Sequence, residues 1–562
     1  MAAQPTYSFP EQTLLTEPIL ENICQQLSFS ELVQLRINSK FRDLSCTVPV
    51  TDLRGNVVYL KGVNAETIAA YSYINENYIE YSLKNAITEN NIPAIYGLLK
   101  SGVSPNIVRE DVTDGQSSAL HLAAEFGNVP VMKILMEFGG DLNLANDNNV
   151  SPIFIAVWES QVEMVKFLLD QGVNPNQIHG LTPWDARSLI EEVANPDHWR
   201  DLSDDPDLAA IFAEKMQKNV QILKLLLSYQ ADPNFSFTLV DNEGQSEVYK
   251  STPLLMVASE GNGNLEMLTL LLEAGANPNI GNKSVAFDGR EKEMRPLSSA
   301  IWLKYWTLIE PLLIAGADPN FDDNKGYPLF LTVLRHKIKM VIFDIIDLLV
   351  KYGADINLKN AQGNTVLGEV LAMGQQYREH IDDSSQLILY LLEKGADCNN
   401  SYNGQPLLMM LSEFYPNFVL RRVLQTDVNV NISVNGVFPI SILSRKNNSE
   451  MVVEFLRKGA DPNVYVHKQS LLSYWIRADN LNVVRAILEA GGNVDGIPQR
   501  KFNEDLPIFA AIYNGSLDIV QLLVQKGSSL SLTGKDGKVV KAFDEAMLHK
   551  QYLIARYLKT IS

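Results

Sequence analysis

Residues 162–176 read Val-Glu-Met-Val-Lys-Phe-Leu-Leu-Asp-Gln-Gly-Val-Asn-Pro-Asn, and this stretch decides how the chain folds. Val165, Leu168 and Leu169 recur at helical spacing, so they predict a short helix with one apolar side. Gly172 follows where the end of a helix needs a residue in the left-handed conformation. The final Asn-Pro-Asn is typical of a turn, so we expect the chain to leave the helix in a hairpin-like finger.

The same phrase recurs along most of the chain. Further copies end at Asn106, Asn143, Asn234, Asn279, Asn320, Asn357, Asn399, Asn431 and Asn463, with weaker copies near Asp495 and Ser531. The interval varies from 32 to 58 residues around a period of about 33. No unit of this size can bury its apolar face alone, so the units must stack. We assign the recurring asparagine to turn chemistry, because it occurs once in each repeat.

A second phrase precedes these copies. It reads Ser118-Ala-Leu-His-Leu-Ala-Ala, Ser151-Pro-Ile-Phe-Ile-Ala-Val and Thr252-Pro-Leu-Leu-Met-Val-Ala at three places. Its proline suits the first turn of a helix, where the missing N–H is not needed. The phrase resembles the Thr-Pro-Leu-His-x-Ala signature of ankyrin repeats, and the resemblance covers residues 82 to 558. It implies an all-α fold, an ankyrin-repeat solenoid with a helix–turn–helix and a finger per repeat, and a structural hydrogen-bonding role for His121.

The repeats set the expected domain organisation. The parts are an N-terminal helical module at 1–50, a connecting segment at 51–81 and a solenoid of about twelve repeats at 82–562. The interval from Asn176 to Asn234 exceeds the period by 25 residues, which predicts an insertion near 191–218. A tolerated surface loop and a functional loop are both open interpretations of it. Residues 539–562 are expected to form a cap of one helix or a helix pair.

The N-terminal module carries a different pattern. Apolar residues along 15–27 lie on one side of a predicted helix, and Ser30 is a good N-cap for a second helix. With Glu31-Leu32, Leu35-Arg36 and Lys40-Phe41-Arg42, this pattern resembles the F-box. It departs from that family at Thr16, which replaces a common proline, and at Pro18, which takes an acidic position.

The F-box resemblance implies a partner. F-box helices pack on the Skp adaptor of cullin–RING ubiquitin ligases, and the residues that would contact it here are Leu15, Ile19, Leu20, Ile23, Leu27, Leu32, Leu35 and Phe41. The alternative is a helix pair that covers the first repeat. An N-terminal F-box with divergent repeats also resembles effectors that intracellular bacteria inject into host cells.

The composition restricts the class of protein. The 562 residues include 47 Lys and Arg against 66 Asp and Glu, a net charge of −19, which disfavours binding to nucleic acid. Cys24, Cys46 and Cys398 form no Cys-x-x-Cys pair, so we expect neither a zinc site nor a disulfide framework. No stretch is long and apolar enough to insert into a membrane, and the first residues lack a standard secretory signal. We therefore expect a cytoplasmic protein.

Catalytic motifs are absent from the sequence. The 7 histidines form no His-Glu-x-x-His motif, and neither a phosphate-binding loop nor Gly-x-Ser-x-Gly occurs. We expect a non-enzymatic protein with no cofactor, no catalytic residue and no metal site. An enzyme hidden in the insertion is a further hypothesis, but about 28 residues are too few for a catalytic domain.

Ankyrin proteins bind partners with the fingers and the concave face of their first helices. The residues expected to project there are Phe126, Trp158, Trp302, Arg335, Arg445, Arg477 and Tyr513. Trp and Tyr are typical anchors of binding hot spots, although aromatic side chains also fill the space between helices. Basic spots such as Arg445-Lys446 could recruit an acidic partner.

These resemblances combine into one functional hypothesis. The F-box-like module would bind the Skp adaptor, and the repeats would recruit a target protein for ubiquitination, in the cytoplasm of a host cell if the chain is a bacterial effector. The alternative is an ankyrin scaffold or inhibitor with no link to ubiquitin ligases.

Overall fold

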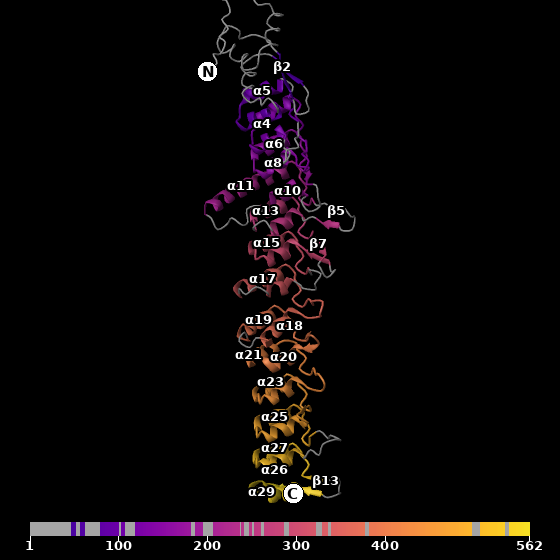
Figure 1. Ribbon diagram of the computed structural model, residues 1–562. Coiled ribbons are helices and arrows are strands. Elements are labelled where there is room, and N and C mark those ends of the chain that lie inside the picture. The colour runs from indigo at the N-terminus through magenta and orange to yellow at the C-terminus, as the bar shows by residue number, and fades with distance from the viewer. Residues whose placement is uncertain are drawn as a thin grey trace, which may run out of the picture. The chain divides into compact units, whose positions relative to one another are not determined.

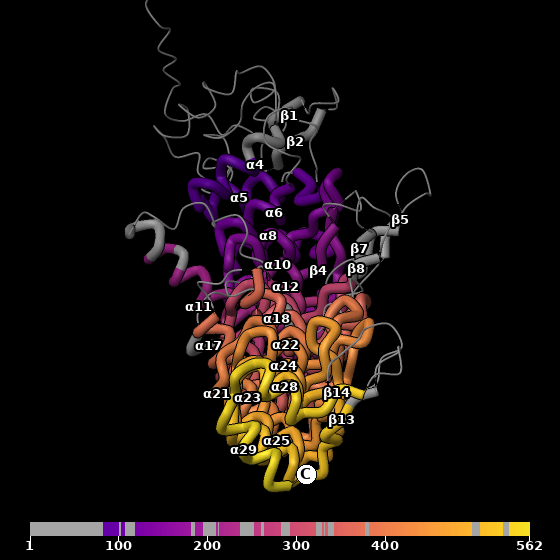
Figure 2. The backbone as a smooth tube through the Cα atoms, turned by 90° about the horizontal axis from the view of Figure 1, so that it is seen from below, coloured from indigo at the N-terminus to yellow at the C-terminus, as the bar shows by residue number. Residues whose placement is uncertain are grey.

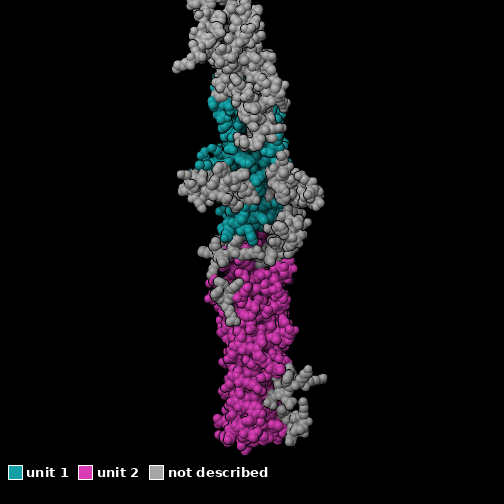
Figure 3. Space-filling model, viewed as in Figure 1, with its two compact units in different colours: residues 1–318 teal, residues 319–562 magenta. Residues whose placement is uncertain are grey.

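The computed structural model describes residues 47–51, 57–61, 79–100, 103–106, 118–180, 186–194, 206–235, 238–240, 247–249, 252–259, 263–285, 291–321, 329–334, 339–376, 381–496, 506–533 and 539–561. Contacts divide the chain into two compact units, residues 1–318 and 319–562 (Figure 3). Each unit is a stack of short helix pairs, with a hairpin or turn beside each pair (Figure 1).

One repeat illustrates how the sequence builds a helix pair. Pro152 occupies the first position of the inner helix α8 (Pro152–Trp158), where no N–H is needed. Ser160, with a φ of 55°, turns the chain into the outer helix α9 (Val162–Asp170). The predicted apolar side of this outer helix is buried at Val165, Leu168 and Leu169.

Unit 1 contains the following helices and strands in its described part. The helices are α4 (Ile79–Thr88), α5 (Ile92–Lys100), α6 (Ala119–Glu125), α7 (Val129–Glu137), α8, α9, α10 (Leu189–Ala194), α11 (Pro206–Ser228), α12 (Pro253–Ser259), α13 (Leu265–Glu273), α14 (Pro296–Trp302) and α15 (Trp306–Ile314). The strands are β1 (Thr47–Thr51), β2 (Val57–Lys61), β3 (Ile178–His179), β4 (Arg187–Ser188), β5 (Thr238–Val240), β6 (Glu247–Tyr249), β7 (Asn282–Val285) and β8 (Glu291–Met294). Consecutive strands pair as antiparallel hairpins, and the β1–β2 hairpin spans the boundary predicted at residue 50.

Unit 2 repeats the plan. Its helices are α16 (Leu329–Leu334), α17 (Lys339–Lys351), α18 (Val366–Gln376), α19 (Ile381–Glu393), α20 (Leu407–Phe414), α21 (Asn417–Leu424), α22 (Pro439–Arg445), α23 (Ser449–Arg457), α24 (Leu471–Arg477), α25 (Leu481–Glu489), α26 (Pro507–Asn514), α27 (Leu517–Gln525), α28 (Ala542–Leu548) and α29 (Tyr552–Ile561). Its strands are β9 (Ser401–Tyr402), β10 (Gln405–Pro406), β11 (Tyr465–Val466), β12 (Gln469–Ser470), β13 (Ser531–Thr533) and β14 (Val539–Lys541). The segment expected to form a cap therefore contains β14 and two helices.

Each unit has three layers, seen along the stack in Figure 2. The inner helices lie between the outer helices and the hairpins. Every repeat therefore covers the apolar sides of both neighbours: Leu135 of α7 and Leu168 of α9 are fully buried. Burial of one leucine side chain stabilises the stack by about 1.5–3 kcal/mol.

Glycine ends the outer helices, as predicted. Gly139, Gly172, Gly275, Gly316, Gly353, Gly395 and Gly459 have φ values between 85° and 98°. Gly102, the other member of the predicted set, lies outside the described residues. Gln230 takes the same position after α11 with a φ of 67°, so that repeat carries left-handed strain that a glycine would remove.

The recurring asparagine does more than turn the chain. The side chain of Asn431 donates from Nδ2 to the carbonyl of Gly459 (2.9 Å) and accepts at Oδ1 from the backbone N–H of Asp461 (2.7 Å). Both partners belong to the next repeat, so the asparagine joins consecutive fingers. The turn itself is stabilised by the residue two positions earlier, since Asn429 Oδ1 accepts from the N–H of Asn431 (3.0 Å).

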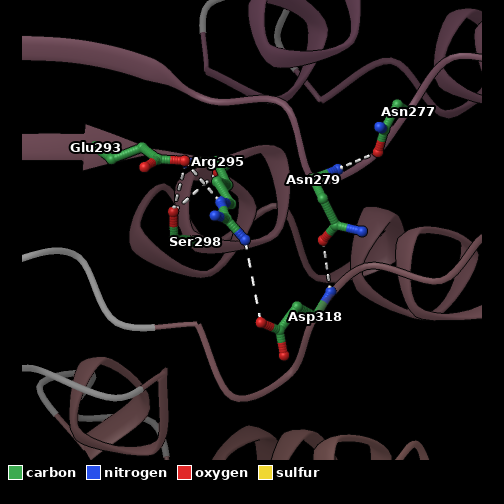
Figure 4. Close-up of polar contacts among 6 residues, drawn as sticks. All are labelled: Asn277, Asn279, Glu293, Arg295, Ser298 and Asp318. Carbon is green, nitrogen blue, oxygen red and sulfur yellow. Dashed lines mark hydrogen bonds and ion pairs between the residues drawn. The ribbon is translucent and has the colours of Figure 1, made fainter.

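This asparagine ladder recurs in both units. The asparagines that make the same pair of bonds to the next repeat are Asn106, Asn234, Asn279, Asn320, Asn357, Asn399, Asn431 and Asn463. In Figure 4, Asn279 accepts from the N–H of Asp318, and Asn277 accepts from the N–H of Asn279. Arg295 lies beside this link, with its guanidinium group 4.0 Å from the Asp318 carboxylate. The assignment of the asparagines to turn chemistry alone was therefore wrong.

The predicted insertion is partly helical. The outer helix α11 has 23 residues, whereas α9 and α13 have 9 each. Its extra turns precede Asn219 and project from the stack, on the side opposite to β5 (Figure 1). At the base of this projection, Ser160 donates from its hydroxyl to Asn219 Oδ1 at 2.7 Å in a buried contact.

Candidate binding surface

The last turns of the inner helices bring one set of predicted residues to the surface of each unit. In unit 1, Phe126 follows α6, Trp158 ends α8 and Trp302 ends α14. Their exposed fractions are 49%, 37% and 54%. We call the exposed residues at the ends of the inner helices the inner-helix strip of that unit.

These exposed aromatic side chains differ from a tryptophan that fills the space between repeats. A tryptophan that fills the space between repeats looks like Trp475 of α24, which is 0% exposed and donates from Nε1 to Ser444 Oγ at 3.0 Å. Trp158 makes an edge-on contact with Phe154, with ring centroids 5.7 Å apart, and still leaves more than a third of its surface open. Trp302 is more open still.

The inner-helix strip of unit 2 is basic and aromatic. Arg445 ends α22, Arg477 ends α24 and Tyr513 lies in the last turn of α26, and all three are exposed. The hydroxyl of Tyr513 donates to Glu545 Oε1 at 2.9 Å, and its ring meets that of His549 at 4.6 Å. Tyr513 is therefore held in one orientation by the following helix.

A charged cluster lies at the base of the α11 projection in unit 1. Burial lowers the pKa of Lys215 on α11, and the carboxylates of Glu159 and Glu192 oppose that effect. Burial and the neighbouring Glu159 raise the pKa of Glu125. Glu192 is buried and lies 3.4 Å from Arg187. Sequence reasoning missed this cluster because its members are far apart in the chain.

His121 has the structural role that the sequence predicted. It is buried; its Nδ1 lies 2.8 Å from Ser118 Oγ, and its Nε2 lies 2.9 Å from the carbonyl oxygen of Val150. Burial lowers its pKa below the ordinary value of 6.5, so the neutral ring is the form that the fold holds. The bond to Val150 ties α6 to the following repeat.

The described ranges bear on three further kinds of site: a metal-binding cluster, a reactive thiol and a membrane-spanning helix. No group of three or more His, Cys, Asp or Glu residues there could hold a metal ion. The thiol of Cys398 is buried, which raises its pKa to about 12 and suppresses the nucleophilic thiolate. None of the described helices combines the length and apolar character that a bilayer crossing requires.

Several predicted site residues lie outside the described residues. They are Arg335 of the target-binding set and the whole Skp-binding set, Leu15, Ile19, Leu20, Ile23, Leu27, Leu32, Leu35 and Phe41. Conversely, the structure adds Leu548, the exposed last residue of α28, to the strip of unit 2. The sequence concealed it because the last helix pair lacks the Thr-Pro-Leu-His phrase.

Comparison with known protein families identifies the repeats. A family model described as "Ankyrin repeats (3 copies)" matches residues 83–179 and 440–534, and one described as "Ankyrin repeat" matches 249–283. The chain therefore carries ankyrin repeats, and the predicted fold class, an all-α ankyrin solenoid, is confirmed. Such repeats form a scaffold for protein–protein interaction.

Known relatives resemble this chain over part of their own length. The chain is 22% identical to the human transient receptor potential cation channel subfamily A member 1 over 84% of this chain and 39% of that protein. It is 36% identical to the Arabidopsis thaliana potassium channel AKT1 over 17% of this chain and 10% of that protein. The chain thus spans well under half the length of these relatives. The human ASB11 ankyrin repeat domain matches 45% of this chain and 90% of its own, with 22% identity and a TM-score of 0.30.

Proposed function

We propose that the chain is a non-enzymatic adaptor that holds a partner protein on the inner-helix strips of its repeats. The observation that carries this proposal is the exposure of Trp302, which contrasts with the complete burial of Trp475. Large aromatic side chains at the surface of a rigid array are typical anchors of an interface. A rigid array favours binding because its helices need not reorganise when the partner binds, which lowers the free-energy cost of association.

Site-specific photo-crosslinking tests this proposal. A photoreactive phenylalanine analogue replaces Trp302 in the full chain, in cells that express the protein. The matched control carries it at Ile314, an exposed apolar residue that ends the outer helix α15 of the same unit. We expect one discrete adduct from the strip and none from the outer helix.

A truncation then checks the role of the tryptophan. Trp302→Ala should weaken capture of the cross-linked protein at least tenfold while stability falls by no more than about 1 kcal/mol. The proposal fails if both crosslinking positions give the same adducts. It also fails if Trp302→Ala unfolds the unit, since that side chain would then belong to the core.

A more specific role rests on the N-terminal sequence. The F-box resemblance of residues 15–42 favours an adaptor that joins the Skp subunit of a cullin–RING ubiquitin ligase to a target held by the repeats. Leu27 ends the apolar side of the first predicted helix there. In this proposal the chain works in the cytoplasm, and in that of a host cell if it is a bacterial effector.

Binding of purified Skp adaptor to the full chain tests the ubiquitin-ligase role. A stable complex with the wild type, lost in Leu27→Asp without a change in thermal unfolding of the repeats, is the expected result. Absence of a complex with the wild type would refute this role and leave the alternative, an ankyrin scaffold or inhibitor without a ligase link.

A further inference from the structure

Two arginines in unit 2 occupy the same position in consecutive repeats. Arg445 is the last residue of α22 and Arg477 the last residue of α24. Both side chains are exposed, and neither forms a hydrogen bond or ion pair in the part of the chain that the structure describes. A pair of unpaired guanidinium groups is thus presented on one strip of a chain whose net charge is −19.

Helix capping does not account for this pair. A basic side chain that caps a helix donates to its last carbonyls, as Lys446 does, and neither Arg445 nor Arg477 makes such a bond in the described residues. The Lys446 ammonium group donates to the carbonyls of Ser412 (3.3 Å) and Glu413 (2.6 Å) at the end of the preceding inner helix. Arg445, its neighbour in sequence, is left to face solvent.

The base beneath the arginines is rigid. Trp475 is fully buried and bonds α24 to Ser444 of α22, immediately before Arg445. On the other side, Asn514 donates from Nδ2 to the carbonyl of Ile476 at 2.6 Å, immediately before Arg477. Packed helices lie about 8–10 Å apart, so the two arginines project from points whose separation is of that order.

Acidic residues limit the positive stretch at both ends. Glu413 is exposed at the end of α20, and Glu545 accepts from Tyr513 at the end of α26. In the described part of unit 2, the two guanidinium groups of this strip therefore lie on adjacent repeats between these two acidic positions. A nucleic-acid backbone needs a longer row of phosphate contacts, whereas two carboxylates of a peptide fit this length.

We propose that Arg445 and Arg477 bind an acidic segment of the partner protein, through two carboxylates about 10 Å apart. In a polyproline II segment, with about 3.1 Å per residue and three residues per turn, Asp or Glu residues three positions apart lie on one face at this spacing. Tyr513, one repeat further on, provides an apolar contact for the residue about three positions after the second acidic residue of the segment. This inference rests on the proposed function and names the chemistry that one strip selects.

Selection of peptides from a displayed library tests the inference. A library of random dodecapeptides is selected on the purified full chain, and the enriched peptides are synthesised with a fluorescent label for anisotropy titration. We expect Asp or Glu pairs three positions apart to dominate. Arg445→Ala and Arg477→Ala should each weaken binding of these peptides at least tenfold.

A matched variant and a charge exchange complete the test. Arg457→Ala removes an exposed arginine from the outer helix α23 of the same unit, and binding should stay within about twofold of the wild type. In Arg445→Glu/Arg477→Glu, peptides with Lys in place of the acidic pair should bind and the acidic peptides should not. Thermal unfolding confirms that each variant is folded.

The outcomes separate this inference from the proposed function. Selected peptides without acidic pairs, or peptides that bind Arg445→Ala/Arg477→Ala as tightly as the wild type, overturn the inference. If such peptides are lost in Trp302→Ala, the proposed function stands and only the arginine site fails. A library that yields no peptide sensitive to any strip residue counts against both.

Discussion

Asn431→Ala tests whether the asparagine ladder stabilises the stack. The substitution removes the bond from Nδ2 to Gly459 (2.9 Å) and the bond from the Asp461 N–H to Oδ1 (2.7 Å). Each hydrogen bond contributes about 0.5–1.5 kcal/mol to stability, and water replaces part of an exposed bond. We therefore expect the free energy of local opening to fall by about 1–2 kcal/mol.

Hydrogen exchange at single residues is the appropriate assay, because a repeat array does not unfold as one unit. The Asp461 amide should exchange about 5–30 times faster in the variant than in the wild type. Asn431→Asp retains the acceptor for this amide and loses only the donor to Gly459, so its effect should be about half as large.

Asn482→Ala provides a control on the same unit. Asn482 is exposed on α25 and makes no ladder bond, so its removal should change stability by no more than about 0.5 kcal/mol. Equal exchange of the Asp461 amide in Asn431→Ala and the wild type would refute the ladder as a source of stability.

Four further substitutions probe other parts of the stack. Gln230→Gly should raise the stability of unit 1 by about 0.5–1 kcal/mol in urea unfolding, since Gln230 has a φ of 67°, while Gly172→Gln should lower it. Trp475→Phe removes the bond to Ser444 and should cost about 1–3 kcal/mol in the same assay. Burial lowers the pKa of His121 in the fold, so the unfolded chain binds more protons than the folded chain below about pH 6.5. The contribution of His121 to stability is therefore present above this pH and is lost as the pH falls. In His121→Gln, the unfolding midpoint should change less between about pH 7 and pH 5 than in the wild type.

The local features of the fold could be predicted from the sequence. Pro152 and Gly172 determine the start of an inner helix and the end of an outer one by backbone restrictions that operate within one repeat. His121 was assigned correctly because its signature position is fixed relative to the helix. These are short-range effects, so a periodic sequence displays them directly.

Contacts between repeats were harder to predict. The Asn431 link and the Lys215 cluster join residues that lie about one repeat or more apart, and turn chemistry gives a sufficient local reason for an asparagine. Exposure could not be predicted either, since Trp302 and Trp475 both belong to inner helices and only packing distinguishes them.

Because of the ladder, consecutive fingers stay linked even where the number of residues in a repeat changes. Asn176 and Asp232 are separated by the longest interval in the array, yet the Asp232 N–H still donates to Asn176 Oδ1 at 2.9 Å. The extra turns of α11 therefore project sideways from the stack, and the fingers on the opposite edge keep their register. We expect the position between α10 and α11 to accept a foreign loop or small domain with the bond between Asp232 and Asn176 kept intact.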